Sequence, residues 1–92
     1  MIDEKIVIYD YPHSSYLELV IKDDCFIFIS EVMIDEDEYS EVHYSLNKIE
    51  TKKVLDILPL DDFIEFAKKE HLKGILDFYK SNGISYITTG VY

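Results

Sequence analysis

The sequence contains one dense group of residues that could do chemistry, the acidic run at positions 35–38 (DEDE). Adjacent carboxylates can bind a divalent cation, and a calcium loop of the EF-hand type would need glycine at its sixth position and glutamate at its twelfth. Counted from Asp35, those positions hold Ser40 and Leu46. The run does not match such a loop. We therefore expect no dedicated metal site and no cofactor, with weak, non-specific divalent binding as the alternative.

Zinc binding and nucleophilic catalysis need other residue types at short spacing. The single cysteine, Cys25, and the histidines His13, His43 and His71 are dispersed along the chain, without the short spacings of zinc ligands. Cys25 could meet His43 across neighbouring strands, but nothing beside it in the sequence would activate a thiol. The glycines are isolated, so no phosphate-binding loop is expected. We predict that the protein is not an enzyme, and hydrolysis by paired carboxylates is the alternative that its many acidic residues leave open.

The balance of charge indicates the class of partner. The chain has nine lysines, no arginine and 19 acidic residues, which gives a net charge of −10, and residues 1–50 alone hold three of the lysines and 13 of the acids. This charge excludes general binding of nucleic acid through phosphate neutralisation and disfavours an anionic membrane surface. A positively charged protein is the partner that fits. The alternative is that the acids keep a small domain soluble and protect the edges of its sheet.

The acids gather in one interval, since no basic residue occurs between Lys22 and Lys48. Tyr39 lies within this interval and could be a rigid aromatic anchor for a lysine- or arginine-rich surface, with a packed loop aromatic as the alternative. The partner-binding residues that we predict are Glu31, Asp35, Glu36, Asp37, Glu38, Tyr39 and Glu41, with Asp61 and Asp62 as second choices.

The acidic interval should lie on β-strands. In the first half of the chain, segments either alternate between apolar and polar residues or are rich in β-branched and aromatic residues, and both patterns are typical of strands. The pattern predicts strands over residues 5–11, 16–22, 25–34 and 41–49, with a tight turn at 23–24 and a loop over 35–39. Leu17, Leu19 and Ile21 should share one face of their strand. In the next strand Phe26, Phe28, Val32 and Ile34 should share one face, and Ile27, Ile29, Glu31 and Met33 the other. In the last of these strands Val42, Tyr44 and Leu46 should face inward. Successive strands of this kind predict an antiparallel meander.

After residue 50 the hydrophobic period becomes helical. We predict a short helix from an N-cap at Thr51 to Leu58, a second helix over residues 60–70, and a third from 71 or 72 to 82. Residues 84–92 are again β-branched and aromatic. The fold predicted for residues 1–92 is therefore a single α+β domain. It has an antiparallel four- to five-stranded meander, two or three short helices from residues 51–82 packed on one face, and a C-terminal strand.

Several features together resemble a known class of proteins. They are the small size, the acidity, the acidic stretch 35–41 with Tyr39, the alternation of Val42, Tyr44 and Leu46, and the junction at 57–64 (ILPLDDFI). The chain is similar to the small acidic immunity proteins of bacterial toxin systems, such as contact-dependent growth inhibition and related polymorphic toxins. The resemblance implies that it binds a cognate toxin domain, often a basic nuclease, and blocks the active site or substrate groove. Acidic side chains would then occupy the place of substrate phosphates.

A different class of function is a cytoplasmic accessory or scaffold domain that acts by homo-oligomerisation or complex assembly. Residues 84–92 could pair edge to edge in a homodimer, and we expect the free chain to be a monomer or a weak dimer. We expect a cytoplasmic protein without a membrane partner, because there is no signal-like leader, no apolar run of bilayer length and only one cysteine.

Overall fold

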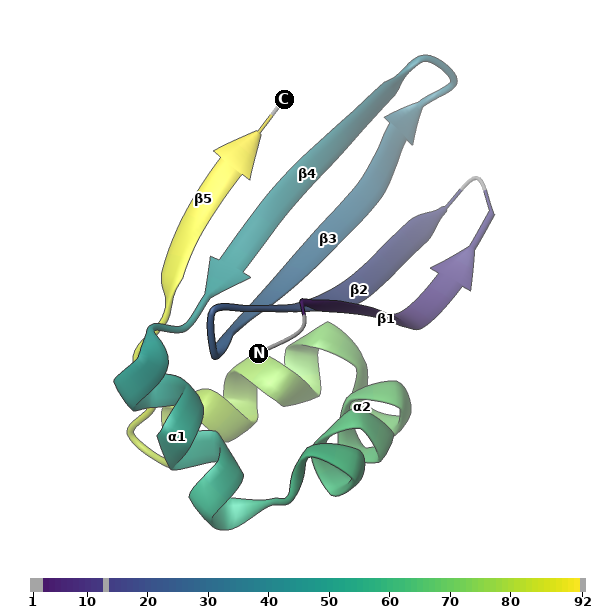
Figure 1. The fold of residues 1–92 in the computed structure, drawn as a ribbon. Helices are drawn as coiled ribbons and strands as arrows, with labels where there is room; N and C mark the ends of the chain where they lie inside the picture. Colours follow the sequence, from purple (N-terminus) through teal and green to yellow (C-terminus); the bar gives the residue numbers. More distant parts are fainter. Residues whose placement is uncertain (1–2, 13, 92) are drawn as a thin grey trace.

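The computed structural model describes residues 3–12 and 14–91, and within them it shows an α+β fold of five antiparallel strands with two helices on one face of the sheet (Figure 1). The strands lie in the sheet in chain order, so the predicted meander is confirmed with five strands. Tyr92, the last residue of the predicted final strand, lies outside the described residues. The elements are β1 (Glu4–Tyr11), β2 (Ser15–Lys22), β3 (Cys25–Asp35), β4 (Glu38–Ser45), α1 (Lys48–Ile57), α2 (Leu60–Ser81) and β5 (Ile87–Val91).

Two tight turns connect the three central strands. Asp23 and Asp24 both have positive φ, 51° and 62°, as a two-residue hairpin turn between twisted strands requires, and this turn is where the sequence predicts it. The loop predicted over residues 35–39 is wrong. Asp35 ends β3 and Glu38 begins β4, because the Asp35 side chain accepts a hydrogen bond from the backbone N–H of Asp37 at 3.0 Å and closes the chain within two residues.

The hydrophobic core lies between the helices and the face of the sheet that they cover, which we call the inner face. The alternating side chains Leu17, Leu19, Ile21, Phe26 and Phe28 are buried there, and each set shares a face as predicted. From the helices they meet Val54, Phe63, Ala67, Ile75 and Tyr79. Burial of each large apolar side chain contributes about 1.5–3 kcal/mol, so this layer is the main source of stability in a sheet that is covered on one face only.

The distal half of the β3–β4 hairpin projects beyond the helices (Figure 1). Val32 and Ile34 alternate in phase with Phe26 and Phe28, as predicted, yet they are exposed to solvent. No helix reaches this end of the sheet to cover them, as Figure 1 shows. The period of a strand therefore fixes the face on which a side chain lies but not whether that face is covered.

Helix α1 begins earlier than predicted, and β4 ends earlier. The N-cap is Asn47, whose side-chain oxygen accepts a hydrogen bond from the backbone N–H of Glu50 at 2.8 Å. Thr51, the predicted N-cap, lies within the first turns of the helix instead, and its side chain is buried. Its hydroxyl accepts a hydrogen bond from the backbone N–H of Phe26 in β3 at 3.1 Å. The strand predicted over 41–49 stops at Ser45 because Asn47 starts a helix there.

Helix α2 contains the second and third predicted helices, joined at a bend. His71 has φ 63° and ψ −171°, which is not helical backbone. Its ring packs on Tyr9 of β1 with the centroids 4.8 Å apart, which holds the bend against the sheet. A Cβ at Gly74 would collide with the Glu70 side chain, so glycine allows the segments on either side of the bend to approach.

Candidate functional site

The face of the sheet opposite the helices, here called the outer face, carries the candidate site. The register places Asp10, Tyr16, Glu31 and Glu41 side by side in one row across β1, β2, β3 and β4. The neighbouring row toward the helical end contains Glu18 opposite Ile29, and Ile29 opposite His43. We call Asp10, Glu18, Glu31 and Glu41 the acidic group. Strand alternation puts Glu18, Glu31 and Glu41 on the outer face, opposite to the inward-facing residues of their strands. Asp10 joins them through its pairing with Tyr16, after a register shift in β1.

Hydrogen bonds link the acidic group to two further side chains. The Tyr16 hydroxyl donates to Oε2 of Glu18 at 2.9 Å, and Nε2 of His43 lies 3.1 Å from Oε2 of Glu41. Glu31 lies directly opposite Glu41. Like charges at directly opposed positions of an antiparallel pair repel and destabilise the sheet. The arrangement therefore stores electrostatic repulsion on the outer face.

The pKa values at the site reflect this crowding. Burial is the largest cause that raises the pKa of Glu31, followed by a side-chain hydrogen bond with Glu41 and by the charges of Glu41 and Glu18. Burial, the hydrogen bond to Glu18 and the surrounding carboxylate charges raise the pKa of Tyr16 to about 12. The Tyr16 hydroxyl therefore stays a donor, and each further negative charge here is disfavoured. Positive charge placed near these carboxylates would therefore lower their mutual repulsion.

A shallow cleft of about 180 Å³ adjoins the acidic group, between the β1–β2 connection and the β3–β4 hairpin. Tyr16, Glu31, Met33 and Tyr39 line it on the outer face, together with Asp10. Tyr39 is 64% exposed and lies opposite Met33 across the strands. The aromatic anchor predicted from the sequence is thus presented to solvent on a strand and is not packed within a loop.

The residues predicted to bind a partner fall into three places. Glu31, Tyr39 and Glu41 lie on the outer face, and Asp35 to Glu38 form the exposed tip of the β3–β4 hairpin. Asp61 and Asp62 lie in the first turn of α2. Figure 1 places that turn at the opposite end of the molecule from the hairpin tip. The fold therefore brings the first two groups together and leaves Asp61 and Asp62 apart from them.

Sequence reasoning missed four members of the site: Asp10, Tyr16, Glu18 and His43. The signal for Glu18 and His43 was present, because each alternates with inward-facing neighbours in its strand. The position of Asp10 depends on a register shift between Val7 and Tyr9. Such a bulge is not marked by glycine or proline here and could not be inferred from alternation.

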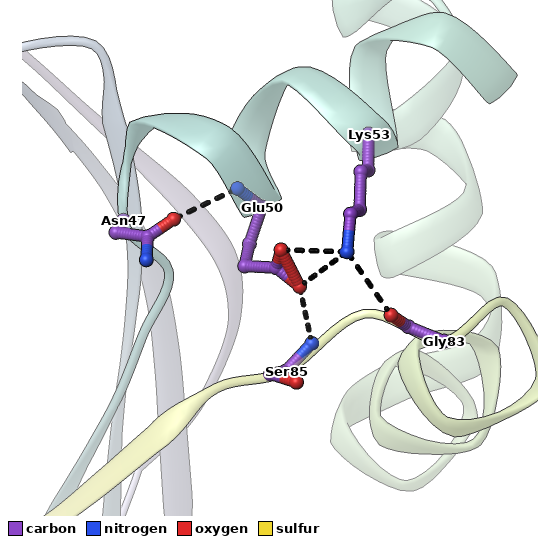
Figure 2. Close-up of polar contacts among 5 residues, drawn as sticks. All are labelled: Asn47, Glu50, Lys53, Gly83 and Ser85. Carbon is purple, nitrogen blue, oxygen red and sulfur yellow. Dashed lines mark hydrogen bonds and ion pairs between the residues drawn. The ribbon is translucent and has the colours of Figure 1, made fainter.

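A second polar cluster joins α1 to the segment before β5 (Figure 2). The carboxylate of Glu50 accepts hydrogen bonds from the backbone N–H of Ser85 at 2.8 Å and from Nζ of Lys53 at 3.0 Å. Nζ of Lys53 also lies 3.4 Å from the carbonyl oxygen of Gly83. These bonds hold the pKa of Glu50 below its usual value, with the Lys53 bond the largest cause. Because its carboxylate is fully engaged within the chain, we assign this cluster a structural role.

The described residues do not form the arrangement that a metal site or an activated thiol would need. Within residues 3–12 and 14–91, no group of three or more histidine, cysteine, aspartate or glutamate side chains could hold a metal ion. His13 lies outside these residues. Cys25 pairs with Lys22 and His43 with Ile29, so Cys25 and His43 are four positions apart along β3 and do not form a dyad.

Comparisons of the chain with protein-family models, curated proteins and solved structures gave no match. In the described part of the chain, neither helix has the length and apolar composition needed to cross a bilayer. What can be said of function therefore rests on the chemistry of the outer face.

Proposed function

We propose that the protein is a cytoplasmic immunity protein that binds and neutralises a cognate bacterial toxin domain, a basic nuclease, through its acidic surface. The observation that carries the proposal is the acidic group. Within this group Glu31 lies directly opposite Glu41. Among the described residues, Lys53 is the one lysine in an ion pair, and its partner is Glu50 on α1 and not a member of the acidic group.

Repulsion of this kind lowers the stability of a small domain that has only about 5–10 kcal/mol in total. A cationic partner converts the same repulsion into attraction. A nuclease must be cationic where it holds phosphates, and a domain of charge −10 complements such a surface and accelerates encounter. The outer face would then cover the substrate groove, with carboxylates in place of phosphates.

The test is co-expression of the chain with each reading frame that adjoins its gene. We expect one neighbouring frame to encode a domain that is toxic alone and harmless when this chain is present. Purified toxin should bind the chain with an association rate that falls at least about tenfold between low and high salt. The proposal is wrong if no adjoining frame is toxic, or if the chain gives no protection against the frame that is.

Two double variants test whether the location of the predicted residues matters, or only their charge. Glu31→Gln with Glu41→Gln should slow association, because both charges lie on the outer face. Asp61→Asn with Asp62→Asn removes the same amount of charge at the far end of the molecule and should leave association nearly unchanged. Equal effects of the two double variants would show that only net charge matters and that the outer face is not the binding surface.

One observation favours the second candidate function, a scaffold that self-associates. β5 is an edge strand whose sequence, ITTGV, has no charged residue and no proline, and these are the usual devices that prevent edge-to-edge pairing. Sedimentation at several protein concentrations separates the candidates. A monomer or weak dimer agrees with the immunity role, and a constitutive dimer favours the scaffold.

A further inference from the structure

The outer face has an apolar half beside its acidic group. Toward the helical end of the sheet, Val20 pairs with Ile27 between β2 and β3, and Val7 and Ile29 flank Glu18 in the adjoining row. Ile87 of β5 continues the Val20–Ile27 row beyond Ser45. We call Val7, Val20, Ile27, Ile29 and Ile87 the apolar stripe.

The stripe is open to solvent, unlike the apolar side chains of the inner face. Val7 is 49% exposed and Ile87 is 69% exposed, and the other three are half-buried by their sheet neighbours. Both helices lie on the other side of the sheet (Figure 1). β-propensity accounts for branched side chains in strands, but threonine satisfies it equally well on a face that stays in water. The apolar stripe is therefore better explained by a partner that covers it.

We propose that the outer face is a protein-docking surface, and that its occupant is a partner protein whose apolar patch is bordered by lysines or arginines. The inference rests on the proposed function and deepens it, because it adds the apolar half of the outer face to the contact and states the chemistry of the partner surface that fits both halves. An apolar centre beside polar and aromatic groups is the usual anatomy of a protein interface. Here the apolar stripe supplies the apolar part, with Glu18 between Val7 and Ile29 and Lys5 at the β1 end of the Val20–Ile27 row. Asp10, Glu31 and Glu41, with Tyr16 and Tyr39, border the stripe on the side of the hairpin tip.

Charge complementarity selects this occupant over others. A second copy laid on the same face would bring one acidic group against another, with Glu31 and Glu41 already repelling each other in a single chain. Nucleic acid and anionic lipid carry the same sign of charge as the border and would be repelled. A cationic protein with an apolar patch satisfies both halves of the face.

The experiment uses a defined probe, a short amphipathic helical peptide with leucines on one side and lysines on the other. It is titrated into the isotope-labelled full chain and followed by NMR. We expect saturable shifts at backbone amides across β1 to β5, centred on three neighbouring rows of the outer face. These rows hold Val20, Ile27 and Ile87, then Glu18 and Ile29, then Tyr16 and Glu31. A peptide with glutamate in place of lysine should give none. Shifts confined to the hairpin tip, to the helices or to the β5 edge would overturn the proposal.

A matched pair of variants tests the apolar half. Ile87 on the outer face and Ile49 on α1 are 69% and 70% exposed, so replacing either with serine should leave the fold intact. Ile87→Ser should weaken peptide binding about tenfold, and Ile49→Ser should change it less than about twofold. Equal affinities for the two variants would show that the apolar stripe takes no part in docking.

The same variants separate this inference from the proposed function. If the chain neutralises its toxin while Ile87→Ser and Glu31→Gln bind that toxin like the original chain, the docking face is wrong and the immunity role stands. If the basic peptide maps to the outer face while no adjoining frame is toxic, the docking face stands and the immunity role is wrong.

Discussion

At the scale of single residues, Glu31 shows the cost in stability that accompanies the binding role proposed for the outer face. Its folded-state pKa is raised by burial and by the hydrogen bond and charge of Glu41. The native state therefore holds the Glu31 proton more tightly than the unfolded state does. Stability from this group is fully present below the unfolded pKa and is lost as pH rises through the folded pKa. At neutral pH the ionised carboxylate works against the fold.

Glu31→Gln should therefore raise the free energy of unfolding at pH 7 by about 0.5 kcal/mol, which is typical of an opposed like-charge pair. The gain should disappear below the unfolded pKa, where the native carboxyl is already protonated. Urea unfolding at several pH values measures both. Glu36→Gln, at the exposed hairpin turn, is the control and should have little effect. A stability loss in Glu31→Gln at neutral pH would contradict the account of the site.

Burial of the Tyr79 hydroxyl is a second feature that lowers the stability of the fold. Tyr79 is completely buried, its hydroxyl has no hydrogen-bond partner among the described residues, and burial raises its pKa. A buried hydroxyl without a partner costs about 1–3 kcal/mol, so Tyr79→Phe should stabilise the protein by roughly 1 kcal/mol in denaturant unfolding. Tyr16→Phe is the contrasting variant, because it removes the hydrogen bond to Glu18 and should not stabilise. A destabilised Tyr79→Phe would mean that the hydroxyl is satisfied in solution.

At the scale of elements, the Glu50 cluster decides how firmly β5 is held. The Lys53 and Ser85 bonds lower the pKa of Glu50 from its usual 4.5, so the stability it provides is present above the unfolded pKa. That stability is lost as pH falls through the folded pKa. Glu50 and Glu31 therefore have opposite pH dependences within one small sheet.

Lys53→Met should accelerate hydrogen exchange at the amides of Ser85 and β5, because Lys53 bridges Glu50 to Gly83 (Figure 2). Lys52→Met changes an exposed neighbour on the same helix and should leave exchange there unchanged. Below the folded pKa of Glu50 the difference between the two variants should shrink, since the carboxyl is then protonated in both and only the bond from Lys53 to Gly83 still distinguishes them. Identical exchange at neutral pH would show that the cluster does not restrain β5.

The elements also show what the sequence could and could not reveal. Alternation in β2, the β-branched and aromatic run of β3 and the Asp-Asp turn between them identified both strands. The start of α1 was missed because Leu46 continues the alternation of β4 although Asn47 caps a helix. The acidic group was only partly foreseen, since its rows depend on register between strands. Sequence spacing identifies the outward residues of each strand but not their cross-strand partners.

At the scale of the whole molecule, the net charge of −10 predicts two opposite effects of salt. The first half of the chain carries this charge, and its strands are neighbours in one sheet. The radius of gyration of the whole molecule is 13.1 Å. The Debye length is about 10 Å at 0.1 M salt. Screening therefore acts on the scale of the sheet and relieves repulsion within the isolated chain, while it weakens attraction to a cationic partner.

We expect sodium chloride to raise the free energy of unfolding of the isolated chain by about 1 kcal/mol between low and moderate ionic strength. The Glu31→Gln, Glu41→Gln double variant should gain less, since part of the repulsion is already gone. Thermal unfolding at matched pH, with a neutral osmolyte as the control for solvent exclusion, measures this gain. The same salt should slow association with the proposed cationic partner. If salt leaves both stability and association unchanged, the acids are solvated independently of one another, and the outer face has no electrostatic reason to bind a cationic protein.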